Sequence, residues 1–172
     1  MPPPAPADAG RELTLVPEPA DSETSLALQQ AFFADIGMRY PGWAPASSQR
    51  VEPSELAPPD GVWLVAYLAG RPVGCGGLQR FDAETAEIRR IFLDERARGR
   101  GIGRALLAGL EDYAKELGYQ RVRLTTGDGQ PEALGLFGSA GYEETSPFTN
   151  GVFTRHWLEK RLIGVEHPGE GS

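Results

Sequence analysis

The residues with the clearest chemical potential form a short run of arginine and glycine, Arg98-Gly99-Arg100-Gly101-Ile102-Gly103. The run stands between a predicted strand and a predicted helix. The first backbone N–H groups of a helix have no acceptor inside it, and the helix dipole places partial positive charge there. Glycines let a phosphate approach these N–H groups, while flanking arginines add positive charge. The loop is therefore expected to bind a pyrophosphate.

Other interpretations of this loop fit less well. No Gly-Lys-Ser/Thr follows, so it is not the loop of a nucleoside triphosphatase. Its glycines do not have the Gly-x-Gly-x-x-Gly spacing of a dinucleotide-binding fold. A glycine turn without function and an RNA-binding arginine-glycine tract are weaker alternatives, because an ordered helix follows an arginine-rich entry.

The helix after the loop is the most regular element of the sequence. Its apolar residues recur at the spacing of one helix face, and Gly118 ends the pattern. These residues are Ile102, Leu106, Leu110, Tyr113 and Leu117. A second helix is expected after a cap at Asp21 or Ser22, and a third over 132–140, with Pro131 in its first turn.

Strands are predicted where apolar residues alternate or cluster between glycines and prolines. They span 12–16, 61–68, 72–81, 87–93, 121–125 and 153–158, with a short strand after Gly141-Tyr142. Residues 38–59 are proline-rich and expected to be mostly loop, with a short helix near Ser54. This order predicts an α/β (α+β) fold whose mixed sheet is antiparallel at its start and has one parallel crossover.

Length and composition narrow the class of protein. The 172 residues allow one domain, expected over 11–163, with a disordered arm at 1–10 and a flexible tail at 164–172. A net charge of −7 disfavours a nucleic-acid binder, yet arginines gather between 89 and 104, which suits a compact anionic ligand. No apolar stretch could span a bilayer and no signal peptide is recognised, so no membrane partner and a cytoplasmic location are expected.

The sequence gives no indication of a metal site. Its single cysteine, Cys75, excludes an internal disulfide and is expected to be a small buried residue of a strand. The two histidines, His156 and His167, do not have the spacing of metal ligands. A structural or surface position is expected for His156.

Three segments together resemble the GCN5-related N-acetyltransferase (GNAT) superfamily. They are Ala86-Glu-Ile-Arg-Arg-Ile-Phe-Leu93, the Arg98–Gly103 run, and Gly129-Gln-Pro-Glu-Ala-Leu-Gly-Leu-Phe-Gly-Ser-Ala-Gly-Tyr142. By element order the resemblance extends over about 13–162. Phe148-Thr-Asn150 and His156-Trp-Leu-Glu-Lys160 also look like a bacterial GNAT subgroup of unsettled substrate. The resemblance implies a GNAT fold with a sheet splayed between its fourth and fifth strands, and acetyl-CoA as cosubstrate.

The resemblance also implies how acetyl-CoA would be held. Backbone groups of Ile91 and Leu93 would pair with the pantetheine arm, on a strand that a bulge splays from its parallel neighbour. Amides of the arginine-glycine loop would hold the pyrophosphate, and residues of the following segments would line the far side. The expected contacts are Ile91, Phe92, Leu93, Arg98, Gly99, Arg100, Gly101, Ile102, Gly103, Arg104, Gln130, Ala133 and Phe137.

Glu87 is the candidate general base. The attacking amine must be neutral, so a base or a water chain must take its proton. Glu87 begins the central strand and shares the alternation of Arg89, Ile91 and Leu93. A purely structural pairing with Arg89 or a neighbouring strand is the alternative. The thioester carbonyl would be polarised by a backbone N–H, for which we expect that of Ile91.

The general acid is where the sequence departs from the family pattern. The resemblance places a tyrosine at the position of Phe137, and a phenylalanine has no proton to give. Tyr142, Ser139 or a water are the candidate substitutes, although Tyr142 is also expected to be a core aromatic residue. An acid is alternatively dispensable because a thiolate is weakly basic.

The resemblance places the acceptor between the segments 38–59 and 146–152. Their candidate contacts are Arg39, Tyr40, Trp43, Phe148 and Asn150. Arg39 could pair with a carboxylate and Asn150 with an amide or hydroxyl, while Tyr40 and Trp43 alternatively pack the loop onto the core. Aromatic walls with a few polar groups suit a small primary amine, acetylated by direct attack in a ternary complex. The alternatives are a protein or peptide N-acetyltransferase and a catalytically weak acyl-CoA-binding module; a homodimer is compatible with the resemblance.

Overall fold

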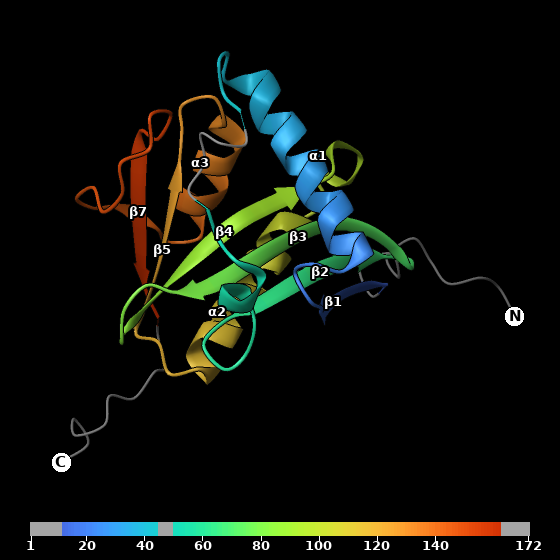
Figure 1. Cartoon of the computed structure of the whole chain (residues 1–172), viewed down its shortest axis with the longest axis horizontal. Coiled ribbons are helices and arrows are strands. Elements are labelled where there is room, and N and C mark those ends of the chain that lie inside the picture. Colours follow the sequence, from blue (N-terminus) through green and yellow to red (C-terminus); the bar gives the residue numbers. More distant parts are fainter. Residues whose placement is uncertain (1–11, 45–49, 163–172) are drawn as a thin grey trace, which may run out of the picture.

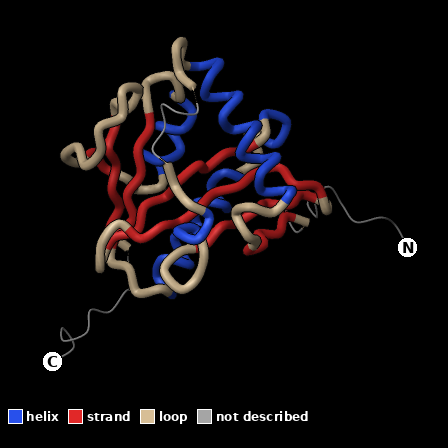
Figure 2. The backbone as a smooth tube through the Cα atoms, in the orientation of Figure 1, coloured by secondary structure: helices blue, strands red, loops and turns tan. Residues whose placement is uncertain are grey.

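A computed structural model of the chain describes residues 12–44 and 50–162. The described part contains a seven-stranded mixed sheet in the order β1-β2-β3-β4-β5-β7-β6, with helices packed against it (Figures 1 and 2). The predicted fold class and element order are confirmed. The predicted arm at 1–10 and tail at 164–172 lie outside the described residues, and the boundaries 11–163 stay a prediction.

The strands are β1 Leu13–Pro17, β2 Val62–Leu68, β3 Arg71–Arg80, β4 Thr85–Leu93, β5 Arg121–Thr126, β6 Glu143–Glu144 and β7 His156–Arg161. The α-helices are α1 Glu23–Arg39, α2 Ile102–Glu116 and α3 Pro131–Ser139, and the short 3-10 helices are η3 Pro53–Leu56 and η4 Glu95–Ala97. Only the β4–β5 pair is parallel among these described strands, because α2 crosses over between them.

Most predicted bounds agree with the structure to within two residues, and two larger differences concern the first helix and the last strand. The first helix continues through Met38 and Arg39, which were expected to be loop, and ends at Tyr40 because Pro41 cannot continue it. The last strand begins at His156 rather than at residue 153, because the Thr154 N–H donates to the Gly151 carbonyl at 3.3 Å in a turn that precedes the strand. That strand also continues past Leu158 to pair along the whole of β5.

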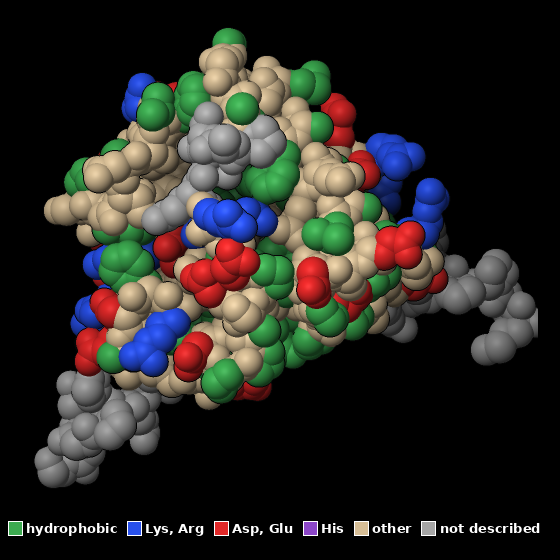
Figure 3. All heavy atoms as spheres, viewed as in Figure 1, with side chains coloured by type: hydrophobic (Ala, Val, Ile, Leu, Met, Phe, Trp, Pro, Cys, Tyr) green, Lys and Arg blue, Asp and Glu red, His purple; other side chains and the backbone are tan. Residues whose placement is uncertain are grey.

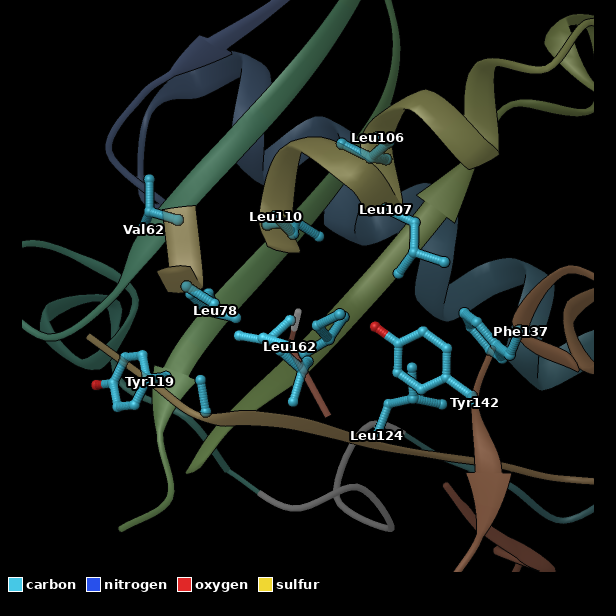
Figure 4. Close-up of a cluster of buried hydrophobic side chains, with 14 of the residues drawn as sticks. Val62, Leu78, Leu106, Leu107, Leu110, Tyr119, Leu124, Phe137, Tyr142 and Leu162 are labelled. Atoms are coloured by element: carbon cyan, nitrogen blue, oxygen red, sulfur yellow. The ribbon is translucent and has the colours of Figure 1, made fainter. Parts of the chain in front are cut away.

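Each face of the sheet has its own hydrophobic cluster. On one face Leu64 and Leu78 pack against Leu106, Leu107 and Leu110 of α2, all of them buried, and Figure 4 shows most of these side chains converging. Complete burial of one such leucine stabilises the fold by about 1.5–3 kcal/mol. The alternation of β2 therefore fixes which face α2 covers.

The opposite face carries α1. Trp63, Val65 and Cys75 point to this side, where they form a cluster with Leu28 of α1. On the face viewed in Figure 3, acidic and basic side chains are mixed rather than gathered by sign. Within 12–44 and 50–162, no helix combines the length and apolar character needed to cross a membrane.

The sheet opens between β4 and β5. β4 pairs with β3 as far as Leu93, but with β5 only over Thr85–Glu87. Beyond Glu87 the two strands diverge toward the end where α1 and α3 lie (Figure 1). This is the splay that the resemblance implied.

A bulge in β4 accompanies the splay. Arg90 has a φ of 55°, and the β3–β4 register shifts between Cys75 and Gly77. Before the bulge Ile88 faces the α2 side, and after it Ile91 does. The prediction that Glu87 shares the alternation of Ile91 and Leu93 is therefore wrong, because the extra residue reverses the side on which odd-numbered residues lie.

Candidate active site

Two pockets adjoin at the splay. The first, of about 290 Å³, lies beside the arginine-glycine loop and is called the loop pocket. The second, of about 580 Å³, is walled by Phe33, Tyr40, Trp43 and Phe148 and is called the aromatic pocket. Phe32 of α1 and Gln130 before α3 line both. The two pockets therefore meet where β4 leaves β5.

Most of the residues predicted to bind the CoA moiety line the loop pocket. They are Ile91, Phe92, Leu93, Arg98, Gly99, Gly101, Gly103, Arg104, Gln130, Ala133 and Phe137. Arg100 is exposed outside this lining, and the side chain of Ile102 is buried in the core beside Ala66 and Ala97. Five further residues, which no motif of the sequence points to, also line the pocket: Phe32, Asp35, Leu106, Glu132 and Leu136.

The loop has the backbone shape that its glycines predict. Gly99 and Gly101 have φ values of 79° and 78°, and Gly101 is the N-cap of α2. A Cβ at either position would meet no atom within 4 Å, so conformation rather than crowding requires glycine here. The open space lies at the N-terminus of a helix whose first N–H groups lack intrahelical acceptors, which fits a pyrophosphate.

Charged side chains connect the loop to both neighbouring helices. Arg98 donates from Nε to the Leu93 carbonyl at 3.1 Å, and its Nη2 lies 3.8 Å from Asp35 Oδ2 on α1. Asp35 also pairs with Arg39 at 3.0 Å, and Arg39 forms a close ion pair with Glu132 of α3. This chain of charges borders the loop pocket and joins three segments around it.

Arg39 differs from the other predicted acceptor contacts. It does not line the aromatic pocket, because Asp35, Glu132 and the Gly129 carbonyl (3.0 Å) already hold its guanidinium. Its observed place is a link between α1 and the segment that leads into α3. The spacing of Asp35 and Arg39 in the sequence allows their ion pair within α1 to be predicted. The contact of Arg39 with Glu132 cannot be predicted in this way.

Tyr40 and Trp43 line the aromatic pocket and also pack its wall. The Tyr40 hydroxyl accepts from Gly129 N–H at 3.1 Å and donates to Gln130 Oε1 at 3.2 Å. Its ring lies 5.7 Å from that of Phe153, and Trp43 lies 5.8 Å from Phe33. Both residues thus line the pocket and pack its wall, and their contact with an acceptor stays a prediction.

Phe148 and Asn150 reach the pocket from the segment before β7. Phe148 is held by Arg123 of β5, whose guanidinium lies 4.9 Å from the ring centroids of both Phe148 and Phe81. Arg123 is itself fixed by Glu159 at 2.8 Å. Such cation–π contacts stabilise by about 0.5–2 kcal/mol each and here position one wall of the pocket.

Glu87 lies inside the aromatic pocket, at the last residue pair that β4 makes with β5. It is buried, with 6% exposure, and burial raises the pKa of its carboxyl although Arg89 and Arg123 act in the opposite direction. Arg89 Nε lies 3.9 Å from Glu87 Oε2. A carboxylate with a raised pKa at the opening of the sheet has the properties of a general base.

Tyr142 lies in the core and lines neither pocket. Its hydroxyl donates to Glu111 Oε2 at 2.9 Å, Glu111 also binds Lys160 at 2.8 Å, and burial raises the pKa of the Tyr142 phenol. Its ring packs edge-on against Phe137 at 5.9 Å, within the cluster of Figure 4. Phe137 therefore separates Tyr142 from the loop pocket, where an acid would be needed.

Other titratable groups are placed away from the chemistry. Ser139 accepts from Arg104 and donates to the Leu136 carbonyl on the exposed side of α3. Burial raises the pKa of the Cys75 thiol to about 12, so it stays protonated near neutral pH. His156 bridges Glu144 and Asp128 at 2.5 and 2.6 Å, and lies outside both pocket linings.

Comparison with known proteins agrees with this geometry. The acetyltransferase (GNAT) family model matches residues 27–142. A relative from Azospirillum brasilense, described as IAA acetyltransferase, is 36% identical over 115 residues, or 66% of this chain and 72% of the relative. Three other curated relatives, from Methanocaldococcus jannaschii, Xenopus tropicalis and Danio rerio, are matched over less than half of their own length.

Solved structures share the fold. An acetyltransferase of the GNAT family from Staphylococcus aureus Mu50 is 17% identical, with a TM-score of 0.72 over 87% of this chain and 99% of that one. A GNAT acetyltransferase from Elizabethkingia anophelis with acetyl-CoA bound is 22% identical, with a TM-score of 0.62 over 86% and 95%. The chain therefore belongs to the GNAT family of acetyl-CoA-dependent acyltransferases.

Proposed function

We propose that the protein transfers the acetyl group of acetyl-CoA to the primary amine of a small molecule, by direct attack in a ternary complex. The observation that carries this proposal is the meeting of the two pockets at the splay, with Phe32 and Gln130 common to both. One pocket has the features of a pyrophosphate site and the other holds a buried carboxylate. Donor and acceptor can thus reach each other without leaving the protein.

On the donor side, β4 offers its backbone beyond Glu87, where β5 no longer pairs with it. The pantetheine arm would pair there near Ile91 and Leu93, and the pyrophosphate would lie at the start of α2. The Leu93 carbonyl is already engaged by Arg98, which fixes the loop relative to the strand. These features support a bound acyl-CoA whose thioester points into the splay.

On the acceptor side, Glu87 would take the proton of the amine directly or through a water. The neutral nitrogen attacks the thioester carbon, and the carbonyl oxygen is polarised by the Ile91 N–H. The new C–N bond forms, the C–S bond breaks, the nitrogen releases its second proton to solvent, and the thiolate takes a proton from solvent. Because Tyr142 faces the core, no phenol is assigned to this last step.

A small acceptor is supported by the size and walls of the aromatic pocket. Its volume of about 580 Å³ falls within the range of small-molecule sites, roughly 300–1,000 Å³. The contact between Tyr40 and Phe153 joins two of its walls. The second candidate function, an acyl-CoA-binding module with weak catalysis, is supported by Phe137 at the position where the family pattern has a tyrosine.

The test is release of CoA thiol from acetyl-CoA with a panel of small primary amines and, in parallel, short peptides with a free N-terminus. We expect at least one small amine to stimulate release and to appear as its N-acetyl derivative by mass spectrometry. Stimulation by peptides alone would support the protein-acetylating alternative. Tight acetyl-CoA binding without release by any acceptor would support the binding module and overturn the proposed activity.

A further inference from the structure

Arg90 carries a charge that the described chain does not neutralise. It lines the aromatic pocket from the bulge of β4, where its φ is 55°. Its Nη1 donates to Gln29 Oε1 at 2.6 Å, and its guanidinium lies 4.8 Å from the ring centroid of Phe33. Over residues 12–44 and 50–162, neither contact is with a carboxylate, and no ion pair of Arg90 is found.

Three other arginines near the two pockets have acidic partners. Arg39 is held by two carboxylates, Arg123 by Glu159, and Arg98 lies 3.8 Å from Asp35. Burial lowers the pKa of Arg90, and the nearby charge of Arg89 acts in the same direction. A guanidinium stays protonated in proteins, so burial of the charged Arg90 side chain destabilises the folded protein. A bound anion would offset this destabilisation.

The side chain of Arg90 is positioned in advance of any ligand. Gln29 is buried, and its amide nitrogen donates to the carbonyls of Ala20 at 2.8 Å and Ser25 at 3.2 Å. These two bonds fix the amide oxygen toward Arg90, while Phe33 supports the guanidinium plane. Such preorganisation reduces the entropy that a ligand must overcome on binding.

We propose that the acceptor carries a carboxylate in addition to its amine, and that Arg90 binds this carboxylate. A guanidinium has five N–H donors in a fork that matches a carboxylate, so one bond to Gln29 leaves several for a ligand. The inference rests on the proposed acetyl transfer and names the substrate class of the same pocket. Arg90 thereby takes the role of carboxylate partner that was predicted for Arg39 from the sequence, because the Arg39 guanidinium is already paired with Asp35 and Glu132.

The pocket also orients such an acceptor. Glu87 and Arg90 are three residues apart on β4, which places their backbones at most about 10 Å apart, and the bulge at Arg90 shortens this separation. The Glu87 carboxylate attracts the amine and repels a carboxylate, whereas Arg90 does the reverse. Phe148 and Trp43 offer apolar surface for the rest of the molecule. An amino acid with an apolar or aromatic body meets all three conditions.

The test uses sets of acceptors that differ only in the carboxylate. Each set contains an α-, β- or γ-amino acid with a phenyl group, its carboxamide and its decarboxylated amine, at pH values that equalise the neutral amine fraction. In the wild-type protein we expect kcat/KM for the best amino acid to exceed that of its carboxamide by about tenfold to a hundredfold, the range for a charge-assisted pair. Equal values for acid and amide would overturn the inference and leave the acetyl transfer standing.

The variant Arg90→Gln should remove this preference. We expect kcat/KM to fall about tenfold to a hundredfold for the amino acid and to change less than twofold for the amide. Arg90→Lys should restore part of the preference, and Arg71→Gln, at an exposed position of β3, should leave it intact. Acetyl-CoA affinity serves as the folding control. Equal losses for acid and amide would show a structural role and overturn the inference.

Binding separates this inference from the proposed activity. If no amine releases CoA, the activity is refuted, and calorimetric titration of the same acids and amides into the protein with CoA then decides the inference. Binding of the acid alone, lost in Arg90→Gln, would support a carboxylate site. Absence of binding, or equal binding of acid and amide, would overturn it.

Discussion

The two pockets of this acetyltransferase are built in different ways. The loop pocket takes most of its lining from one continuous stretch, Ile91 to Leu106, and its expected contacts are backbone N–H groups at the start of α2. The aromatic pocket gathers side chains from α1, β4, the end of β5 and the segment before β7. A ligand held by backbone N–H groups still binds when side chains are substituted. A ligand held by side chains is affected by each substitution. Under the proposed function, this construction would let the acceptor vary while the donor stays the same.

The largest effect is expected from Glu87→Gln, which tests the aromatic pocket as the place of the base. Loss of a general base slows turnover by about 10²–10⁴-fold, and acetyl-CoA affinity should not change. Because burial raises the pKa of Glu87, the acid limb of the wild-type kcat/KM profile should lie above the usual carboxyl range, with activity rising as pH increases through it. The measurement is kcat/KM against pH by thiol release.

The control for this change is Glu116→Gln, at an exposed position of α2 outside both pocket linings. It should leave both kcat/KM and the pH profile as in the wild type. Normal turnover in Glu87→Gln would assign Glu87 to its ion pair with Arg89 alone.

The next effect concerns the loop pocket. Gly101→Leu introduces a side chain where a phosphate must approach, so the dissociation constant for CoA should rise about a hundredfold, the equivalent of one or two charge-assisted hydrogen bonds. Gly118→Leu is the matched control, because Gly118 also has a positive φ and open space but lies at the other end of α2. Both variants should lose similar stability, and only the first should lose CoA. Unchanged CoA binding by Gly101→Leu would remove the loop from the donor site.

The same contrast explains what the sequence could predict. The loop pocket could be predicted from the sequence, because its glycines, the apolar stripe of α2 and Phe137 lie within short stretches. In such stretches the spacing of the residues indicates their structure. The reversal of alternation at Arg90 was not, because it depends on the register of β4 against β3 around Cys75 and Gly77. A bulge in one strand is visible only when its partner is in place.

The aromatic pocket was predicted in part for a related reason. Tyr40, Trp43, Phe148 and Asn150 could be placed by resemblance, since the loops that carry them flank known elements. Arg39 was predicted to bind a ligand, and this prediction overlooked its ion pair with Glu132. That contact joins residues far apart in the chain, so the sequence does not reveal it. The sequence marks Arg90 and Phe33 only as residues of a strand and a helix, and their contact becomes visible only when α1 packs on the sheet.

A smaller effect is expected from Tyr142→Phe, which tests whether the core beneath Phe137 takes part in catalysis. Removal of the hydroxyl leaves Glu111 without one of its two partners, so the free energy of unfolding should fall by about 1–3 kcal/mol in urea titration. The value of kcat should not change, because the phenol does not reach the loop pocket. Tyr113→Phe is the control, since no hydrogen bond of its hydroxyl is found in the described part of the chain. A large fall in kcat at unchanged stability would make Tyr142 the acid.

The smallest effect concerns His156 of β7, whose ring binds Asp128 in the segment between β5 and α3. The same segment contains Gln130, which lines both pockets. The hydrogen bonds that the His156 ring makes to the carboxylates of Glu144 and Asp128 raise the pKa of His156 above 6.5. A raised pKa means that the imidazolium is bound more tightly in the folded protein, so this stabilisation is complete below pH 6.5 and is lost as the pH rises through the folded value. Because both carboxylates are largely exposed, the contribution should stay below about 1 kcal/mol. The Tm difference between wild type and His156→Gln should therefore shrink as the pH rises above 6.5, and a difference independent of pH would show that the imidazole contributes by packing and not by charge.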